Sequence, residues 1–318
     1  MESGRLLFTK FLKGELLSRP PFVPLVRGLP SRVDGMPFET LTSDPTLWAN
    51  SLLKTTELFG FDGVVAGFHF SLLAEACGCQ IVWEEDRPVV LLPASGQLHE
   101  QPELQGRMRN ALEATSRVFQ MCRSERACIA AVTGPATLAS QVFGRDQGPT
   151  RVKEVKHLAV RVTEAFCRTR PDVLIFMEGR PLALADLTPA YRRTYQTLKN
   201  IVSYYNIHAG LYLQGYRPDN LKAFSSLKMD LYVLGPSLDG SLPGLADLQE
   251  LGAEALGFGL GLPLNDFEKS KEIIEEGREI YRFRRGQGFF FTSHGPVTRE
   301  VDLEALHKLV DEIHRISL

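Results

Sequence analysis

The sequence predicts an α/β fold, a single (β/α)8 TIM barrel, and three observations support it. Eight short apolar runs recur along the chain, each ends in Gly, Pro or a polar residue, and nearly all lead into helix-like sequence. The runs are continuously apolar rather than alternating, which is typical of strands buried on both faces in a parallel barrel. The length of 318 residues fits one such domain with additional loops, since the fold typically takes about 250 residues. The expected strands are Phe22 to Arg27, Gly63 to Phe70, Cys128 to Gly134, Val173 to Glu178, Ala209 to Gln214, Leu231 to Ser237, Ala255 to Gly261 and Phe289 to His294.

Several connections carry signals for the start of a helix. Positions 44–45 (Asp-Pro) and 188–189 (Thr-Pro) each place an N-cap residue before a proline at the first helical position, an arrangement favoured at helix N-termini. The first of these predicts a helix that ends at Gly60, and the second a helix that ends near Asn206. Asp302 to Ile316 has its apolar residues on one face, which predicts the last helix of the outer ring.

One segment, Gln80 to Gln105, breaks the alternation of strand and helix. It contains two β-rich pieces, Ile81 to Trp83 and Val89 to Leu92, and we interpret it as a loop excursion or small hairpin. The chain shows no short-period repeat, low-complexity tract or interdomain linker. We therefore expect residues 1–318 to form a single domain.

Composition narrows the function classes. The chain has 36 basic and 38 acidic residues, a net charge of −2, and a hydrophobic share of 44%, which is ordinary for a globular protein and gives no support for nucleic-acid or membrane-surface binding. Five scattered cysteines indicate a reducing compartment rather than a disulfide framework. No signal-peptide pattern and no run near the roughly 20 apolar residues of a membrane span are seen, so we expect a cytoplasmic location.

The polar residues that close the strands are the candidate site, because chemistry in this fold collects at the C-terminal strand ends. Arginines there suit an anionic substrate, and histidine or glutamate suits proton transfer. Each of these residues also has a purely structural interpretation. The arginines could be solvated charges at the rim of the barrel, His69 could be a core histidine, and Glu178 could pair with Arg180. Gln214 and Ser293 are also explained as hydrogen-bonding residues, and His294 is the strongest candidate. The full set is Arg27, Arg32, His69, Glu178, Arg180, Gln214, Ser293 and His294.

Two further motifs are weaker. Cys77-Gly78-Cys79 has no second ligand pair at metal-site spacing, so free cysteines are the favoured interpretation. The glycine-rich stretch 257–261 lacks a complete dinucleotide fingerprint, although its backbone N–H groups would suit an anion.

Short motifs in the order of the chain resemble the uroporphyrinogen decarboxylase superfamily, which holds haem-pathway decarboxylases and corrinoid-linked methyltransferases. The last motif matches the segment where decarboxylases carry Gly-His-Gly. The motifs are Arg19-Pro20-Pro21, 58–63 (LFGFDG), 74–78 (AEACG), 133–139 (TGPATLA), 187–189 (LTP) and 291–296 (FTSHGP).

The resemblance also marks departures from the decarboxylases. Arg27 and Arg32 stand where the family has a differently spaced paired-arginine motif that binds substrate carboxylates. His69 replaces the essential aspartate of the second strand, Gln141 aligns near the family's tyrosine, and no clear serine lies near Leu182. Only His294 carries over directly.

The methyltransferase branch differs as well. The resemblance places its zinc ligands at a His-x-Cys-Gly after the fifth strand and at a late cysteine, where this chain has Tyr212 to Gly215 and His294. Tyr212 and Gln214 then become substrate-binding candidates. A different zinc site formed by His69, Glu178 and His294 is a further alternative, because two histidines and a carboxylate suit zinc.

Three functional hypotheses follow. The first is a decarboxylase-like lyase without a cofactor, in which Arg27 and Arg32 bind an acid-rich, tetrapyrrole-type substrate and His294 and His69, with Glu178, handle the proton. The second is methyl transfer with a corrinoid protein as partner and corrinoid or zinc as cofactor. The third is a noncatalytic tetrapyrrole or corrinoid binder. The resemblance also implies a homodimer.

Overall fold

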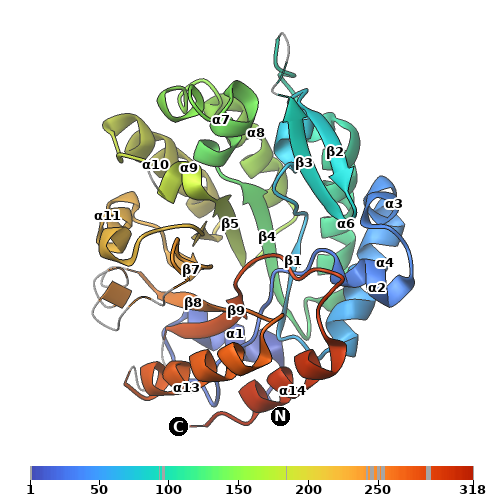
Figure 1. Ribbon diagram of the computed structural model, residues 1–318, viewed down its shortest axis with the longest axis vertical. Helices are drawn as coiled ribbons and strands as arrows, with labels where there is room; N and C mark the ends of the chain where they lie inside the picture. Colours follow the sequence, from blue (N-terminus) through green and yellow to red (C-terminus); the bar gives the residue numbers. More distant parts are fainter. Residues whose placement is uncertain are drawn as a thin grey trace.

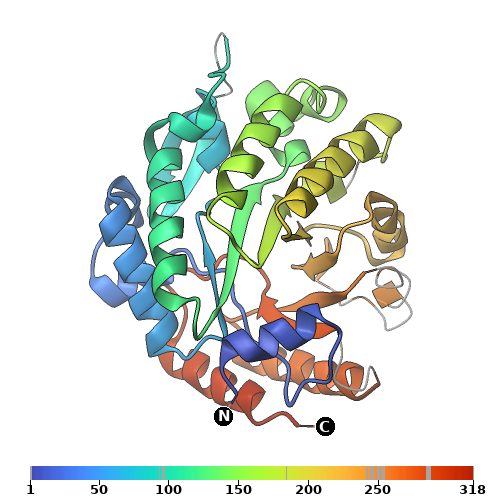
Figure 2. The same cartoon turned by 180° about the vertical axis from the view of Figure 1, so that it is seen from behind.

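A curled, seven-stranded parallel sheet forms the centre of the computed structural model, with helices around its outside (Figures 1 and 2). The structure describes residues 2–92, 94, 97–183, 185–240, 243, 247–248, 251, 255–283 and 288–317. The strand order β1-β4-β5-β6-β7-β8-β9 follows the chain, and each neighbouring pair is parallel. The strands are β1 (Gly63–Ala66), β4 (Ala127–Thr133), β5 (Val173–Glu178), β6 (His208–Leu213), β7 (Leu231–Leu234), β8 (Gly257–Leu262) and β9 (Phe289–Ser293).

Seven of the eight predicted strands are confirmed, because continuous apolar runs became strands buried on both faces. Every residue of these strands is buried except His208 at the start of β6. The predicted strands Gly63 to Phe70 and Leu231 to Ser237 end earlier, at Ala66 and Leu234.

The first predicted strand, Phe22 to Arg27, does not form a regular strand. It makes isolated parallel bridges from Phe22 to Phe291 and from Val26 to Val297. On its other side, the Phe22 carbonyl accepts the Asp62 amide at 3.0 Å. Prolines at positions 20, 21 and 24 lack the N–H that a ladder requires, so an eighth ladder is replaced by scattered bonds between β9 and the start of β1.

The predicted hairpin is confirmed. β2 (Gln80–Glu84) pairs antiparallel with β3 (Arg87–Leu92). The hairpin packs on the segment after β1, where Ser71 donates a hydrogen bond to the Pro88 carbonyl at 2.5 Å. It therefore covers the C-terminal end of β1.

The predicted helix starts are confirmed at positions 44, 188 and 302. Asp44 accepts the amides of Thr46 and Leu47 at 2.7 and 2.9 Å, and Asp302 accepts the Ala305 amide at 2.9 Å, whereas the Thr188 side chain makes no capping bond. The helices are α1 (Gly4–Leu12), α2 (Leu29–Asp34), α3 (Phe38–Ser43), α4 (Pro45–Leu58), α5 (Leu72–Ala76), α6 (Gly106–Cys122), α7 (Pro135–Phe143), α8 (Lys156–Cys167), α9 (Arg180–Ala183), α10 (Pro189–Tyr204), α11 (Leu221–Phe224), α13 (Phe267–Phe283) and α14 (Leu303–His314).

The N-terminal ends of the strands are closed by packing and by a buried ion pair. Helix α1 lies across this end (Figure 2), and its Phe11 ring meets Phe290 edge-on at 5.2 Å. Arg19 binds both oxygens of Asp62 at 2.7 Å. Burial opposes ionisation of Asp62, but these bonds and the charge of Arg19 hold its pKa at about 2. Within the described residues, no helix is long and apolar enough to cross a membrane.

Candidate functional site

Arg27 and His69 are buried charged or polar residues that lack partners. Arg27 is 8% exposed and His69 is 1% exposed. Among the described residues, Arg27 Nε and both ring nitrogens of His69 have no hydrogen-bond partner. Most buried polar groups in proteins are hydrogen-bonded, so each exception requires an explanation. A bound anion that accepts from both residues would satisfy Arg27 Nε and one ring nitrogen of His69.

Arg27 contributes to the electrostatic environment of His69. Burial, followed by the charges of Arg27 and Arg107, lowers the pKa of His69 to about 3. Burial also lowers the pKa of Arg27; the charge of Arg87 acts in the same direction, and Asp86 and Glu300 oppose it. His69 is therefore neutral at neutral pH, and the charges of Arg27 and Arg107 act on it.

Aromatic side chains from outside the seven-stranded sheet enclose His69. Its ring meets Phe38 of α3 at 6.4 Å and Trp83 of β2 at 5.9 Å, both edge to face. Arg107 of α6 lies over the Trp83 ring, 5.1 Å from its centre. Asp86, in the hairpin turn, accepts the Phe38 amide at 2.8 Å, so the hairpin and α3 are joined directly above His69.

Sequence reasoning missed this enclosure. Phe38, Trp83, Asp86 and Arg107 come from two helices and a hairpin rather than from strand ends. The departure of the hairpin from the strand–helix alternation was the one signal that pointed to it. Long-range packing of that segment onto the end of β1 leaves no local pattern.

Glu178 is also fully buried, but its carboxylate is satisfied. It accepts the amides of Ala136 and Thr137 at 3.0 and 2.8 Å, and hydroxyl bonds from Thr137 and Tyr195. Burial raises the pKa of Glu178 to about 7, although these bonds oppose the increase. The carboxylate sits at the N-terminus of α7, which favours negative charge, and a Cβ at Gly134 would collide with it. Glu178 therefore joins α7 and α10 to the end of β5.

The Glu178–Arg180 pair, which the sequence left open, does not form. Arg180 is exposed, and its side chain lies against Gly215, where an added Cβ would come within 2.7 Å of Arg180 Cγ. This places Arg180 beside Gln214 at the end of β6.

His294, Tyr212 and Gln214 form a second group at the strand ends. The Tyr212 hydroxyl donates to the His294 carbonyl at 2.5 Å and lies 3.2 Å from Gln214 Oε1. Tyr212 is fully buried, and burial raises the pKa of its hydroxyl. The half-buried His294 has its pKa lowered to about 4 by burial and by the charge of Lys269, so this imidazole is neutral at neutral pH as well.

Two predicted substrate-binding residues make structural contacts. Ser293 Oγ accepts the Leu25 amide at 2.9 Å, which replaces a ladder bond of the irregular first strand. Arg32 donates to the carbonyls of Arg299 and Val301 at 3.1 and 2.6 Å, and so holds the segment after β9 against α2.

The donor set does not fit zinc. In the described part of the chain, no group of three His, Cys, Asp or Glu residues could hold a metal ion, so His69, Glu178 and His294 do not form the alternative zinc site. All five cysteines are free and buried, as expected for Cys77 and Cys79. The glycine-rich stretch 257–261 is no anion loop, because it lies in the buried strand β8 and the Phe258 amide bonds the Gly288 carbonyl at 3.0 Å.

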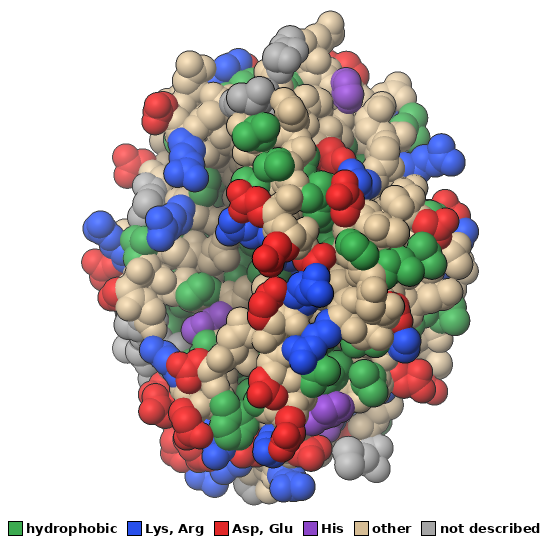
Figure 3. Space-filling view, turned by 45° about the vertical axis from the view of Figure 1, so that its right-hand side comes forward, with side chains coloured by type: hydrophobic (Ala, Val, Ile, Leu, Met, Phe, Trp, Pro, Cys, Tyr) green, Lys and Arg blue, Asp and Glu red, His purple; other side chains and the backbone are tan. Residues whose placement is uncertain are grey.

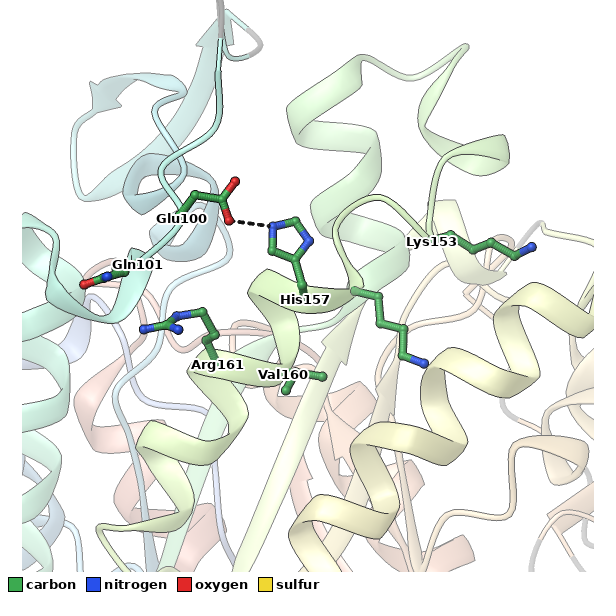
Figure 4. A pocket seen from close by; sticks show the side chains of 7 residues that line it. Glu100, Gln101, Lys153, His157, Val160 and Arg161 are labelled. Carbon is green, nitrogen blue, oxygen red and sulfur yellow. Dashed lines mark ion pairs between the residues drawn. The ribbon is translucent and has the colours of Figure 1, made fainter.

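A pocket of about 600 Å³ lies at the periphery, between the start of α8 and residues 100–101 (Figure 4). No predicted site residue lines it. Some of its polar side chains are paired within the protein: Glu100 meets His157 at 3.3 Å, and Arg161 pairs with Glu103. Acidic and basic side chains also lie next to each other in the middle of the face shown in Figure 3.

Comparisons with known proteins agree with this fold. A family model described as uroporphyrinogen decarboxylase (URO-D) matches residues 4–176, more than half of the chain. A solved methyltransferase from Methanosarcina mazei is similar at a TM-score of 0.77 and 18% identity, with 99% of this chain and 100% of that chain covered. A putative vitamin-B12 independent methionine synthase from Listeria monocytogenes is similar at a TM-score of 0.57 and 13% identity, with 94% and 96% covered. These structural likenesses concern the fold. A search of curated proteins gives no match.

Proposed function

The chain belongs to the uroporphyrinogen decarboxylase family, and on that premise we propose that it is a lyase that decarboxylates an acid-rich, tetrapyrrole-type substrate. Arg27 binds a substrate carboxylate, and His69 and His294 are the candidate proton carriers. We infer that the fold is a (β/α)8 barrel in which the irregular segment Phe22 to Arg27 takes the place of the first strand. Arg32, Arg180, Gln214, Tyr212 and Ser293 support or line the mouth of this site.

The unpartnered, buried Arg27 beside His69 is the observation that carries the proposal. The buried Arg27 Nε without an acceptor is unfavourable, and a carboxylate matches the planar set of donors of a guanidinium. Bound there, the carboxylate would also accept from a ring nitrogen of His69. A substrate with several acid groups leaves another carboxylate free to react.

Substrate binding would change the protonation state of His69 and so make it a proton donor. Unliganded, His69 has a pKa of about 3, so at neutral pH it is the neutral imidazole and a poor acid. A negative carboxylate beside it raises the pKa of an imidazole, so substrate binding at Arg27 favours the imidazolium. When the reacting C–C bond breaks, CO₂ leaves, the electron pair remains on carbon, and the imidazolium transfers its proton there.

His294 is the second proton carrier in this proposal. It follows β9 directly, it is half-buried, and its backbone is fixed by the Tyr212 hydroxyl and by a bond from its amide to the Leu262 carbonyl at 2.8 Å. Its neutral imidazole is suited to accept a proton from solvent or substrate. Glu178 fixes the neighbouring helices and is a positioning residue.

Methyl transfer with a corrinoid protein is the alternative. The similarity to the Methanosarcina mazei methyltransferase over nearly the full length of both chains favours it. In this alternative the cofactor is a corrinoid and the partner is a corrinoid protein; a zinc cofactor would need ligands other than His69, Glu178 and His294. A homodimer is proposed from the family resemblance.

Anaerobic incubation with uroporphyrinogen, followed by chromatography of the products, tests the proposal. We expect decarboxylated products from the natural chain, a loss of about 100-fold in rate for Arg27→Gln, and an unchanged rate for the control Arg193→Gln, an exposed arginine on α10. A folded protein that forms no product from uroporphyrinogen, but demethylates a methylcorrinoid protein, would replace the lyase proposal with the alternative.

A further inference from the structure

Two cysteines meet at the end of the sheet opposite the candidate site. Cys122 is the last residue of α6, and Cys128 is the second residue of β4. Their sulfur atoms are 4.0 Å apart. Because β4 begins here, the pair lies at the N-terminal strand ends, whereas Arg27 and His69 lie at the other end.

A tight turn between α6 and β4 holds the two thiols in place. The amides of Glu125 and Arg126 both donate to the Cys122 carbonyl, at 3.0 and 2.9 Å. The Cys128 amide donates to Asp172 Oδ2 at 2.8 Å. Both thiols are thus carried by regular, anchored elements, and only a small closing movement separates them from the S–S bond length of about 2.05 Å.

The two thiols differ in access and environment. Cys122 is 9% exposed and Cys128 is fully buried, so a small oxidant in solvent reaches Cys122 first. The bond from Cys128, followed by the charges of Arg123 and Arg126, lowers the pKa of Cys122 although burial opposes this, whereas the same bond and burial raise the pKa of Cys128.

The other cysteines have the opposite environment. Burial raises the pKa of Cys77 and Cys167 to about 12 and that of Cys79 to about 11. Thiolates rather than thiols react with oxidants, so these three are inert by comparison.

We propose that Cys122 and Cys128 form a redox-active dithiol that a hydroperoxide converts to a disulfide. The Cys122 thiolate attacks one peroxide oxygen, the O–O bond breaks, and hydroxide leaves, which gives a sulfenic acid. The released hydroxide takes the proton of Cys128 and becomes water, the Cys128 thiolate attacks the Cys122 sulfur, and the hydroxyl group of the sulfenic acid leaves as hydroxide, which becomes water with the proton that Cys122 had released. Two thiols are oxidised and one hydrogen peroxide is reduced to two water molecules.

This pair suits a disulfide better than a metal. No third ligand completes a metal-binding group around it among the residues that the structure describes. The disulfide would join the end of α6 to the start of β4, at a turn where Arg126 also donates to the Phe61 carbonyl at 2.6 Å. It would therefore restrain the N-terminal edge of the sheet.

Treatment of the folded protein with hydrogen peroxide, followed by intact-mass analysis and nonreducing peptide mapping, tests the proposal. We expect a product lighter by two hydrogen atoms, a cross-linked peptide containing Cys122 and Cys128, and restoration by a reducing agent. Cys128→Ser should instead accumulate a sulfenic acid at Cys122 that dimedone traps. Cys167→Ser is the matched control and should form the same disulfide.

Two results would overturn the inference. One is natural protein that gains oxygen atoms at Cys122 without cross-linking. The other is a chain that stays unmodified at peroxide concentrations that oxidise a free thiol. Because the natural protein alone decides both, failure of a serine variant to fold does not obscure the answer.

Discussion

Two buried titratable groups at the strand ends, Glu178 and the Arg27–His69 pair, differ in one respect. Glu178 receives four hydrogen bonds from α7 and α10. Among the described residues, three buried nitrogens of Arg27 and His69 make no hydrogen bond. Burial alone therefore does not distinguish a site residue from a structural one. Between these residues the difference is whether the protein itself supplies the hydrogen bonds, because a group that it leaves unsatisfied can bind another partner.

Arg27→Gln is expected to have the largest effect, and on function rather than stability. Removal of the guanidinium should lower uroporphyrinogen decarboxylation by about 100-fold, since charged hydrogen bonds to the substrate are lost. Stability should stay the same or rise, because no protein partner is lost and a buried charge is removed.

The matched control is Arg126→Gln, at the opposite end of the sheet, where the side chain bonds the Phe61 carbonyl. It should show the reverse pattern, with lower stability and unchanged turnover. If Arg27→Gln and Arg126→Gln changed turnover equally, the proposed difference in function between the two ends of the sheet would be contradicted.

Glu178→Ala should mainly reduce stability, by about 3 kcal/mol, because it leaves two amides and two hydroxyls without their acceptor in a buried position. Urea unfolding measures this loss. Arg180→Ala, an exposed neighbour, should change stability by less than about 0.5 kcal/mol. A Glu178→Ala protein as stable as the natural chain would show that the carboxylate is not the anchor described above.

His69 and Glu178 should also differ in how their contributions to stability depend on pH. The pKa of His69 falls from 6.5 to about 3 on folding, so the unfolded chain binds the additional proton between these values. The contribution of His69 to the free energy of unfolding should be complete above pH 6.5. Below that pH it should fall by about 1.4 kcal/mol per pH unit. Unfolding of His69→Asn at several pH values should lack this component; parallel curves for both proteins would contradict a neutral, buried His69.

Glu178 acts in the opposite direction. Its folded pKa of about 7 lies above the ordinary value of 4.5, so the folded chain keeps a proton that the unfolded chain has released. Its contribution to stability is present below pH 4.5 and decreases as the pH rises toward 7. Comparison of Glu178→Gln with the natural chain across this window measures it, and a difference that is independent of pH would contradict the raised pKa.

Ser293→Ala should have a small effect. Its hydroxyl accepts the Leu25 amide, and loss of that bond should reduce stability by about 1 kcal/mol with turnover nearly unchanged. A large loss of turnover at unchanged stability would return Ser293 to the substrate-binding residues that the sequence predicted.

The sequence predicted the elements whose signals are local. Continuous apolar runs identified seven strands, and the Asp-Pro dipeptide at 44–45 identified the start of α4, because both patterns are encoded within a few residues. The irregular first segment was predicted as a strand since its apolar residues outweighed the prolines at positions 20, 21 and 24. Those prolines removed the amides that a regular ladder requires.

The candidate site was predictable only in part. Strand-end position found Arg27, His69 and His294, because parallel strands bring their C-terminal ends together. It did not separate Glu178 from them, since its donors come from α7 and from Tyr195 of α10, at sequence distances that no motif records. For the same reason, the enclosure of His69 by Phe38 and Trp83 required the structure.

Equilibrium binding of uroporphyrinogen under anaerobic conditions, compared between the natural chain and Arg27→Gln, tests the central claim most directly. It measures anion recognition by Arg27 whether or not the bound molecule reacts. The account predicts binding by the natural chain and an affinity about 100-fold weaker for the variant. Equal affinities of two equally stable proteins would contradict the claim that this unpartnered guanidinium is the substrate anchor.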